Sequence, residues 1–242
     1  MKDEFQVSMM PSENKPDDKR FKKLKYSKVL FKPPFTLCVV GMIGSGKTSF
    51  VYSLIEAYPK YWDECVIFCG TKDSNHAWEG LNQRKVVVFN DWDEDAFEQY
   101  FKDLEKENER RRNEKEPELR ACVVFDDMIA DNISKRGRST SLEKCLLNTR
   151  HYNLSVIILT QSIKLLSRTM RINMMYYAIF KVNRSELLRI AEDNAGLLTE
   201  DEFIDMTQEV LKKPYNYLII DNKATPDKRF RDTLNYVIPL DR

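Results

Sequence analysis

Seven short β-rich runs, most of them continuously apolar, dominate this chain. They lie at residues 36–40, 65–69, 85–89, 121–125, 155–159, 176–182 and 216–220. A strand with one face in water alternates apolar and polar residues, whereas a strand covered on both faces is apolar throughout. Helical segments separate the runs. The pattern therefore predicts a doubly wound α/β fold, with a mostly parallel sheet and helices on both faces.

The length and composition suit one globular domain and exclude several classes of protein. The chain has 242 residues, 42% of them hydrophobic, and a net charge of +1, so a nucleic-acid surface has to be local. We expect no membrane span and no secretory signal, since no apolar run is long enough. The five cysteines form no C-x-x-C pair, which predicts reduced thiols in an intracellular protein.

Two charged segments flank or interrupt the apolar pattern. Residues 1–33 are polar and then basic, with aromatic residues interleaved, and predict a partly disordered N-terminal arm, or alternatively a nucleic-acid or partner contact. The remaining residues, 34–242, form the predicted domain. Within it, residues 93–120 begin amphipathically and become almost purely charged. They predict a solvated helical projection, with a subunit or DNA contact through Arg110 to Arg112 as the alternative.

A phosphate-binding motif follows the first predicted strand and opens a predicted helix. The segment GMIGSGKT, residues 41–48, has the form G-x-x-x-x-G-K-[ST], in which backbone N–H groups and a helix N-terminus face phosphate oxygens. We expect Lys47 to contact the β- and γ-phosphates of ATP and the Thr48 hydroxyl to bind Mg²⁺. The predicted nucleotide-binding residues are Gly41, Gly44, Ser45, Gly46, Lys47, Thr48 and Ser49.

Two carboxylates follow the fourth apolar run, in the segment ACVVFDDM. A phosphate-loop enzyme needs one acid to hold Mg²⁺ beside the Thr48 hydroxyl, and Asp126 fits that position. A second acid orients the attacking water, which predicts Asp127 as a catalytic residue. The alternative is a strand that simply ends in an Asp-rich turn.

Signatures of other phosphate-loop classes are missing. A GTPase needs N-K-x-D, and NKAT at residues 222–225 lacks the final acid. The L-S-G-G-Q-like signature of ABC-type ATPases is absent, and no lid segment typical of a small-molecule kinase is clear.

The segment NTRHYNLSVIILTQS, residues 148–162, has polar residues at both ends of an apolar strand. In additional-strand ATPases this strand lies between the phosphate-loop strand and the acidic strand, so Gln161 would face the γ-phosphate as a sensor. The alternative is an ordinary strand exit. Arg150 is either an arginine finger, reaching the nucleotide of a neighbouring subunit, or a cation that complements a helix dipole.

Four segments together resemble the FtsK–HerA superfamily, with the genome-packaging ATPases of large DNA viruses, virophages and related elements as the nearest likeness. They are PFTLCVVGMIGSGKT, VVFDDM, TRHYNLSVIILTQS and PYNYLIIDN, and the likeness covers roughly residues 34–222. The resemblance implies a RecA-like, additional-strand (ASCE-type) phosphate-loop ATPase. The family's catalytic Lys, Mg²⁺ acid, second acid, sensor Gln and trans-acting Arg map onto Lys47, Asp126, Asp127, Gln161 and Arg150. Cellular members commonly have Glu at the second acid, where this chain has the shorter Asp127.

The resemblance also implies a function and partners. It implies a Mg²⁺-dependent motor that moves double-stranded DNA into a preformed capsid through a homo-oligomeric ring of about five or six subunits. Its partners would be DNA, other copies of itself and a capsid component, at the virus assembly site in the host cytoplasm, with the virion as a further location. Lys135, Arg136 and Arg138 are candidate DNA contacts of a pore loop, or else belong to a surface loop. The alternative functions are another DNA motor, such as a helicase or a transposon-associated ATPase, and a nucleotide-switched binding protein.

Overall fold

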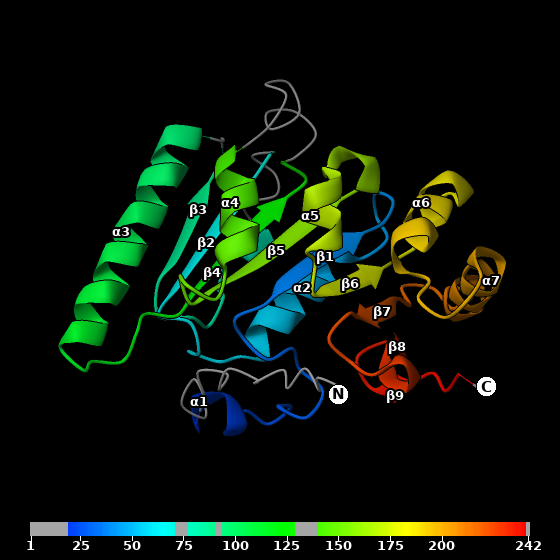
Figure 1. Cartoon of the computed structure of the whole chain (residues 1–242), viewed down its shortest axis with the longest axis horizontal. Helices are drawn as coiled ribbons and strands as arrows, with labels where there is room; N and C mark the ends of the chain where they lie inside the picture. The colour runs from blue at the N-terminus through cyan, green and yellow to red at the C-terminus, as the bar shows by residue number, and fades with distance from the viewer. Residues whose placement is uncertain (1–18, 71–76, 91–92, 129–139, 241–242) are drawn as a thin grey trace, which may run out of the picture.

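The structure is a computed structural model that describes residues 19–70, 77–90, 93–128 and 140–240. A nine-stranded sheet lies at its centre. The strand order is β3-β2-β4-β5-β1-β6-β7-β8-β9 (Figure 1). The strands are β1 (Thr36–Val40), β2 (Glu64–Cys69), β3 (Val86–Phe89), β4 (Ala121–Asp126), β5 (Leu154–Thr160), β6 (Tyr176–Ile179), β7 (Leu218–Asp221), β8 (Phe230–Asp232) and β9 (Tyr236–Val237). The α-helices are α1 (Lys19–Lys22), α2 (Lys47–Glu56), α3 (Glu94–Asn113), α4 (Thr140–Asn148), α5 (Arg168–Ile172), α6 (Arg184–Asn194) and α7 (Glu200–Val210).

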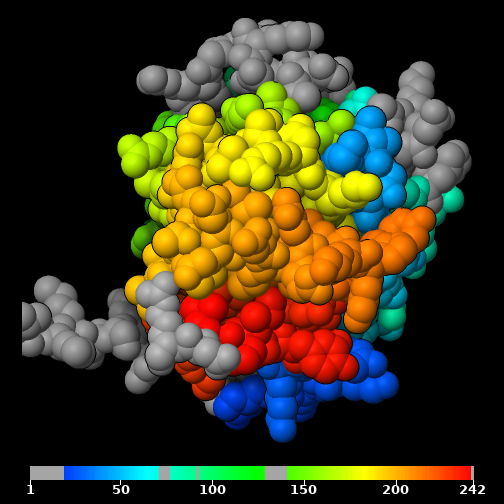
Figure 2. Space-filling view, turned by 90° about the vertical axis from the view of Figure 1, so that its right-hand side faces the viewer, coloured from blue at the N-terminus to red at the C-terminus, as the bar shows by residue number. Residues whose placement is uncertain are grey.

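The sheet is parallel from β3 to β6 and antiparallel from β6 to β9. All seven predicted runs contain a strand, and the prediction of a mostly parallel α/β sheet is confirmed. The last two strands were not predicted, because three and two residues of mixed polarity carry no recognisable period. They extend the sheet at one edge, and with α6 and α7 they form the face in Figure 2.

Helices cover both faces of the sheet, as predicted. Cys38 and Val40 point into a core shared with α3, α4, α5, α6 and α7. Leu37 and Val39, at the alternate positions of β1, point into a second core, which contains residues of α1 and α2. Side chains of a strand alternate between its two faces, so a strand that is apolar throughout contributes to both cores.

The basic segment before β1 packs on the second core. Phe21, Leu30 and Phe31 are buried, and the Phe31 ring lies 4.2 Å from the Tyr176 ring, centroid to centroid. Over residues 19–33 the segment is therefore part of the folded domain, so residue 33 is not a domain boundary there. Residues 1–18 of the predicted arm lie outside the described residues.

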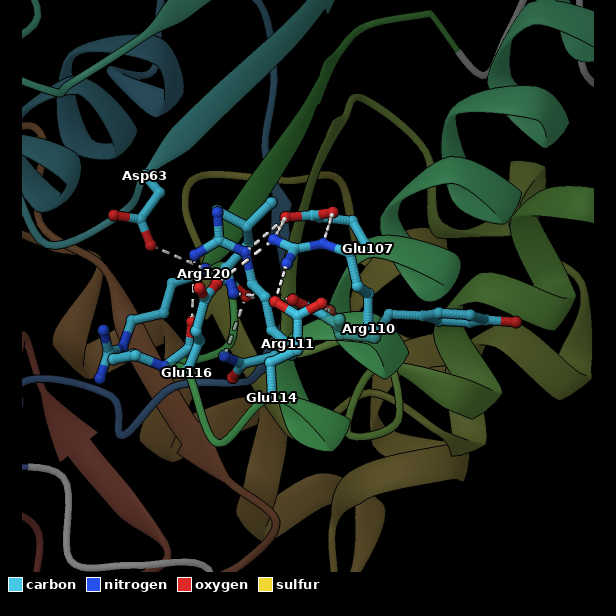
Figure 3. Close-up of polar contacts among 12 residues, drawn as sticks. Asp63, Glu107, Arg110, Arg111, Glu114, Glu116 and Arg120 are labelled. Atoms are coloured by element: carbon cyan, nitrogen blue, oxygen red, sulfur yellow. Dashed lines mark hydrogen bonds and ion pairs between the residues drawn. The ribbon is translucent and has the colours of Figure 1, made fainter.

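The charged helix α3 lies along the sheet and does not project from it. Three apolar residues of the helix, Phe97, Phe101 and Leu104, are buried, and so is Asn108. At its end, Arg110 pairs with Glu107, Glu114 and Glu116, in the ion-pair network drawn in Figure 3. The predicted projection is wrong because one helical stripe is apolar enough to pack.

Candidate nucleotide and magnesium site

The phosphate loop joins β1 to α2. Gly46, the N-cap residue of α2, has φ 98°, a left-handed conformation that favours glycine. A Cβ atom on Gly41 would lie only 2.6 Å from Ser45 Oγ and 2.6 Å from Phe180 Cβ. The loop therefore needs glycine at position 46 for its backbone conformation and at position 41 for close packing.

The loop borders a cleft of about 720 Å³, a size suited to a nucleotide. The predicted loop residues Gly44, Ser45, Gly46, Lys47, Thr48 and Ser49 all line it, together with Asp127. Lys47 Nζ donates to the carbonyl oxygens of Gly41 (2.9 Å) and Met42 (3.3 Å). In the described structure Ser45 Oγ is buried and lacks a hydrogen-bond partner, which suits a loop built to meet phosphate oxygens.

Asp126 is the last residue of β4, and its side chain is buried. Its carboxylate accepts a hydrogen bond from Trp78 Nε1 over 3.2 Å, and the Thr48 hydroxyl lies near enough to favour the ionised carboxylate. Burial and the neighbouring Asp127 raise its pKa to about 6, while Trp78, Lys47 and Thr48 oppose the rise. A carboxylate and a hydroxyl side by side are hard oxygen ligands, which fit a Mg²⁺ ion that also binds nucleotide phosphates.

Trp78 is a residue of this site that the sequence analysis missed. It lies 48 residues before Asp126, in a short segment outside the apolar runs, and its side chain is 1% exposed. The only polar atom of a tryptophan side chain is Nε1, and in Trp78 it donates to the carboxylate that we expect to hold the metal. No local pattern could have indicated this contact, because it is created by tertiary packing.

Asp127 lines the same cleft, beside the phosphate-loop lysine. Its Oδ2 atom is 4.0 Å from Lys47 Nζ and accepts a hydrogen bond from Gln161 Nε2 over 3.1 Å. Strand β5 lies between β1 and β4, as an additional-strand ATPase requires, and this brings Gln161 to the same sheet edge. Asp127 also has φ 53°, a left-handed conformation that Asp adopts more readily than most residues.

A second missed residue holds the chain immediately after Gln161. The buried carboxylate of Glu186, at the start of α6, accepts from Ser162 Oγ and from the Ile163 backbone N–H, both over 2.8 Å. The segment that follows Gln161 is therefore attached to α6. In a sequence, a Glu near a helix N-terminus indicates only a favourable interaction with the helix dipole. The hydrogen bonds of Glu186 to Ser162 and Ile163 could therefore not be predicted.

Arg150 lies at the amino-terminal ends of the parallel strands, whereas the phosphate loop lies at their carboxyl-terminal ends. It precedes β5, whose seven residues span roughly 20 Å at about 3.3 Å each. The side chain is exposed, and its charge, with that of Lys32, adds to burial in lowering the pKa of Lys223. Arg150 is therefore too far from the phosphate loop of its own chain to contact a nucleotide there.

Lys135, Arg136 and Arg138 lie outside the described residues. Among the helices that are described, none combines the length and the hydropathy that a membrane crossing needs.

Comparisons with known proteins support the same fold. One family model, described as Poxvirus A32 protein, matches residues 19–235. The crystal structure of B204, the DNA-packaging ATPase from Sulfolobus turreted icosahedral virus, is similar with a TM-score of 0.60 and 13% identity, over 87% of this chain and 100% of that one. B204 from Sulfolobus turreted icosahedral virus 2, in complex with ATP-gammaS, gives 0.56 and 17%, over 80% and 94%.

A bacterial protein shares the fold as well. EssC (ATPases 2 and 3) from Geobacillus thermodenitrificans gives a TM-score of 0.59 and 12% identity, over 78% of this chain and 38% of that one. None of the curated protein sequences compared with the chain matches it. The predicted RecA-like phosphate-loop fold is confirmed, and the findings are consistent with the predicted resemblance to the FtsK–HerA superfamily. The chain belongs to the Poxvirus A32 protein family.

Proposed function

We propose that this protein is an ATP-driven translocase that packages a double-stranded viral DNA genome into a preformed capsid. The observation that carries the proposal is the meeting of Lys47, Asp127 and Gln161 at one end of the cleft, beside the Asp126–Thr48 pair. A protein that only binds nucleotide has no need of a second acid and a sensor amide there. Family membership and the B204 structures support the packaging role.

Hydrolysis would use these residues in separate roles. Asp127 would accept hydrogen bonding from the attacking water and take its proton, and Gln161 would orient the same water. Lys47 would contact the β- and γ-phosphates. Thr48 and Asp126 would hold Mg²⁺, which when bound neutralises charge on the phosphates.

Arg150 would act on the nucleotide of a neighbouring subunit in a ring. Its place at the sheet edge opposite its own phosphate loop supports a role in trans. Lys32 and Lys223 lie close enough for their charges to interact with one another, so this edge is locally basic and suited to approach a triphosphate. An arginine supplied in trans contributes roughly 10³- to 10⁵-fold to the hydrolysis rate.

DNA would pass through the ring, with Lys135, Arg136 and Arg138 contacting its phosphates. Substituting all three with Ala should weaken duplex binding and flatten its dependence on salt concentration, because fewer counterions are released. An unchanged salt slope would assign these residues to a surface loop.

The test of the proposed function is ATP hydrolysis as a function of protein concentration, with no DNA, single-stranded DNA or duplex DNA. We expect the rate per subunit to rise steeply with concentration, since active sites form between subunits, and to rise further with duplex. Stimulation by single strands alone would favour a helicase. An absence of turnover under every condition would favour a nucleotide-switched binding protein. Lys47→Ala is the control that should be inactive throughout.

A further inference from the structure

The phosphate loop lies between two flanks of different chemistry. In the sheet, β4 and β5 lie on one side of β1, and β6 and β7 lie on the other. The first flank carries Asp127 and Gln161. The second carries aromatic residues that also line the cleft: Phe180 after β6, and Tyr215 and Tyr217 before β7. The catalytic groups and the aromatic groups are therefore on opposite sides of the loop.

Most of the aromatic flank has a packing role. The Tyr217 ring lies 4.6 Å from the Phe50 ring and 5.1 Å from the Phe180 ring, measured between centroids. Phe50 and Phe180 are themselves buried. These rings support α2 directly below the phosphate loop.

Tyr215 is different, because it lines the cleft with 75% of its surface exposed. Its Cδ1 atom lies 3.5 Å from the position that a Cβ on Gly46 would occupy, so the ring lies against the start of α2. The segment that carries it, coloured orange, projects beside the blue segment that follows β1 (Figure 2). An exposed ring contributes little to the core, so packing does not account for its position.

The backbone holds this ring in place. Tyr215 has φ 60°, a left-handed conformation that a bulky residue rarely adopts. The next residue, Asn216, anchors the turn, since its side-chain amide donates to Val210 O over 2.7 Å and to Asp232 Oδ1 over 2.9 Å. Strained backbone held by its surroundings is typical of ligand-binding positions.

We propose that Tyr215 binds the purine base of the nucleoside triphosphate by stacking. With the γ-phosphate beside Lys47 and Asp127, the α-phosphate and the nucleoside extend toward the other flank, past Ser49 to Tyr215. The inference rests on the proposed function only in taking a nucleoside triphosphate as the ligand of the cleft. Stacking uses the face of a base and not its hydrogen-bonding edge, so ATP and GTP should bind with similar affinity.

The test compares ATP with tripolyphosphate, which has the phosphates but no base. Calorimetry would give both dissociation constants for the wild type, Tyr215→Ala and Tyr215→Phe. We expect Tyr215→Ala to weaken ATP binding by about 5- to 150-fold, the range for loss of one stacked base, and to leave tripolyphosphate binding unchanged. Tyr215→Phe keeps the ring and should bind ATP as the wild type does.

Two results would overturn the base site while leaving the phosphate site intact. One is ATP binding by Tyr215→Ala equal to that of the wild type. The other is an equal weakening of ATP and tripolyphosphate, which would mean that Tyr215 only supports the phosphate loop. Wild-type protein that bound neither ligand would instead contradict the proposed function, and the base site with it. Melting temperatures near that of the wild type would verify that both variants fold.

Discussion

The indole N–H of Trp78 donates a hydrogen bond to the carboxylate of Asp126, over 3.2 Å and out of contact with solvent. The contact orients the acid that we expect to hold Mg²⁺ beside Thr48. It also favours the ionised carboxylate, and so opposes the rise in pKa that burial causes. We therefore propose Trp78 as a positioning residue of the expected magnesium site.

Trp78→Phe should raise the Mg²⁺ concentration needed for nucleotide binding. A hydrogen bond to a charged group contributes about 1.5–3 kcal/mol, so we expect a shift of about tenfold or more. Nucleotide binding measured in a Mg²⁺ titration checks this. Trp62→Phe is the matched control, since Trp62 is equally buried in the same core cluster. Equal shifts in the two variants would mean that the effect comes from lost packing.

Asp126→Asn should stabilise the metal-free protein at neutral pH. The folded-state pKa of Asp126 is about 6, against an ordinary value of 3.8. Below about pH 3 the carboxyl is largely neutral in both states, so the substitution has little effect there. As the pH rises to about 6 the unfolded chain ionises first, and the wild type loses up to roughly 3 kcal/mol of stability, which persists above that pH.

Urea unfolding in the presence of a chelator, at about pH 3 and at about pH 8, measures this difference. The advantage of Asp126→Asn should appear only at pH 8, and Mg²⁺-dependent nucleotide binding should be lost. An equal effect on stability at both pH values would contradict the account. Asp103→Asn, at an exposed position of α3, is the control for exchanging an acid for an amide.

Asp127→Asn should bind ATP normally but hydrolyse it about 10²- to 10⁴-fold more slowly, since a general base is lost. Asn tolerates the left-handed backbone at this position as Asp does, so the fold should be kept. Glu lacks that tolerance, and Asp127→Glu should cost about 1–2 kcal/mol of stability. Single-turnover hydrolysis and equilibrium unfolding test the two effects. Near-wild-type turnover by Asp127→Asn would exclude it as the base.

Arg150→Ala and Lys47→Ala should each be inactive alone and active when mixed. In a mixed ring, an Arg150→Ala subunit keeps its phosphate loop and receives Arg150 from a Lys47→Ala neighbour. In a random equal mixture, about a quarter of the subunit boundaries join the phosphate loop of an Arg150→Ala subunit to the intact arginine of a Lys47→Ala subunit, and these boundaries form complete active sites. Steady-state ATPase of the mixture measures the recovery. Lys144→Ala, which removes another exposed cation near the same loop, should stay active alone. Failure of the mixture to recover would argue against a role in trans.

The features that could be predicted from the sequence are local ones. A phosphate loop is a run of eight residues, and a buried parallel strand is a run of about five, so both leave a signature over a short window. Gln161 could be predicted because it closes the first apolar strand after Asp126. The order β4-β5-β1 then follows from the additional-strand topology.

The features that could not be predicted are of two kinds. Some depend on contacts between residues far apart in the sequence, and others are buried apolar residues in a segment whose average composition is highly charged. The Trp78–Asp126 and Glu186–Ser162 contacts join segments 48 and 24 residues apart. Phe21 and Phe31 lie among so many lysines that the composition suggested a solvated arm, yet both rings are buried. The lysines can extend into water while the rings pack inward, and average charge does not report this.

The central claim is movement along double-stranded DNA, and displacement of a third strand from a DNA triplex tests it most directly. The assembled protein, given ATP and Mg²⁺, should release the third strand from a duplex track. Lys47→Ala and Asp127→Asn should release none. Hydrolysis of ATP stimulated by duplex DNA with no release of the third strand would contradict translocation.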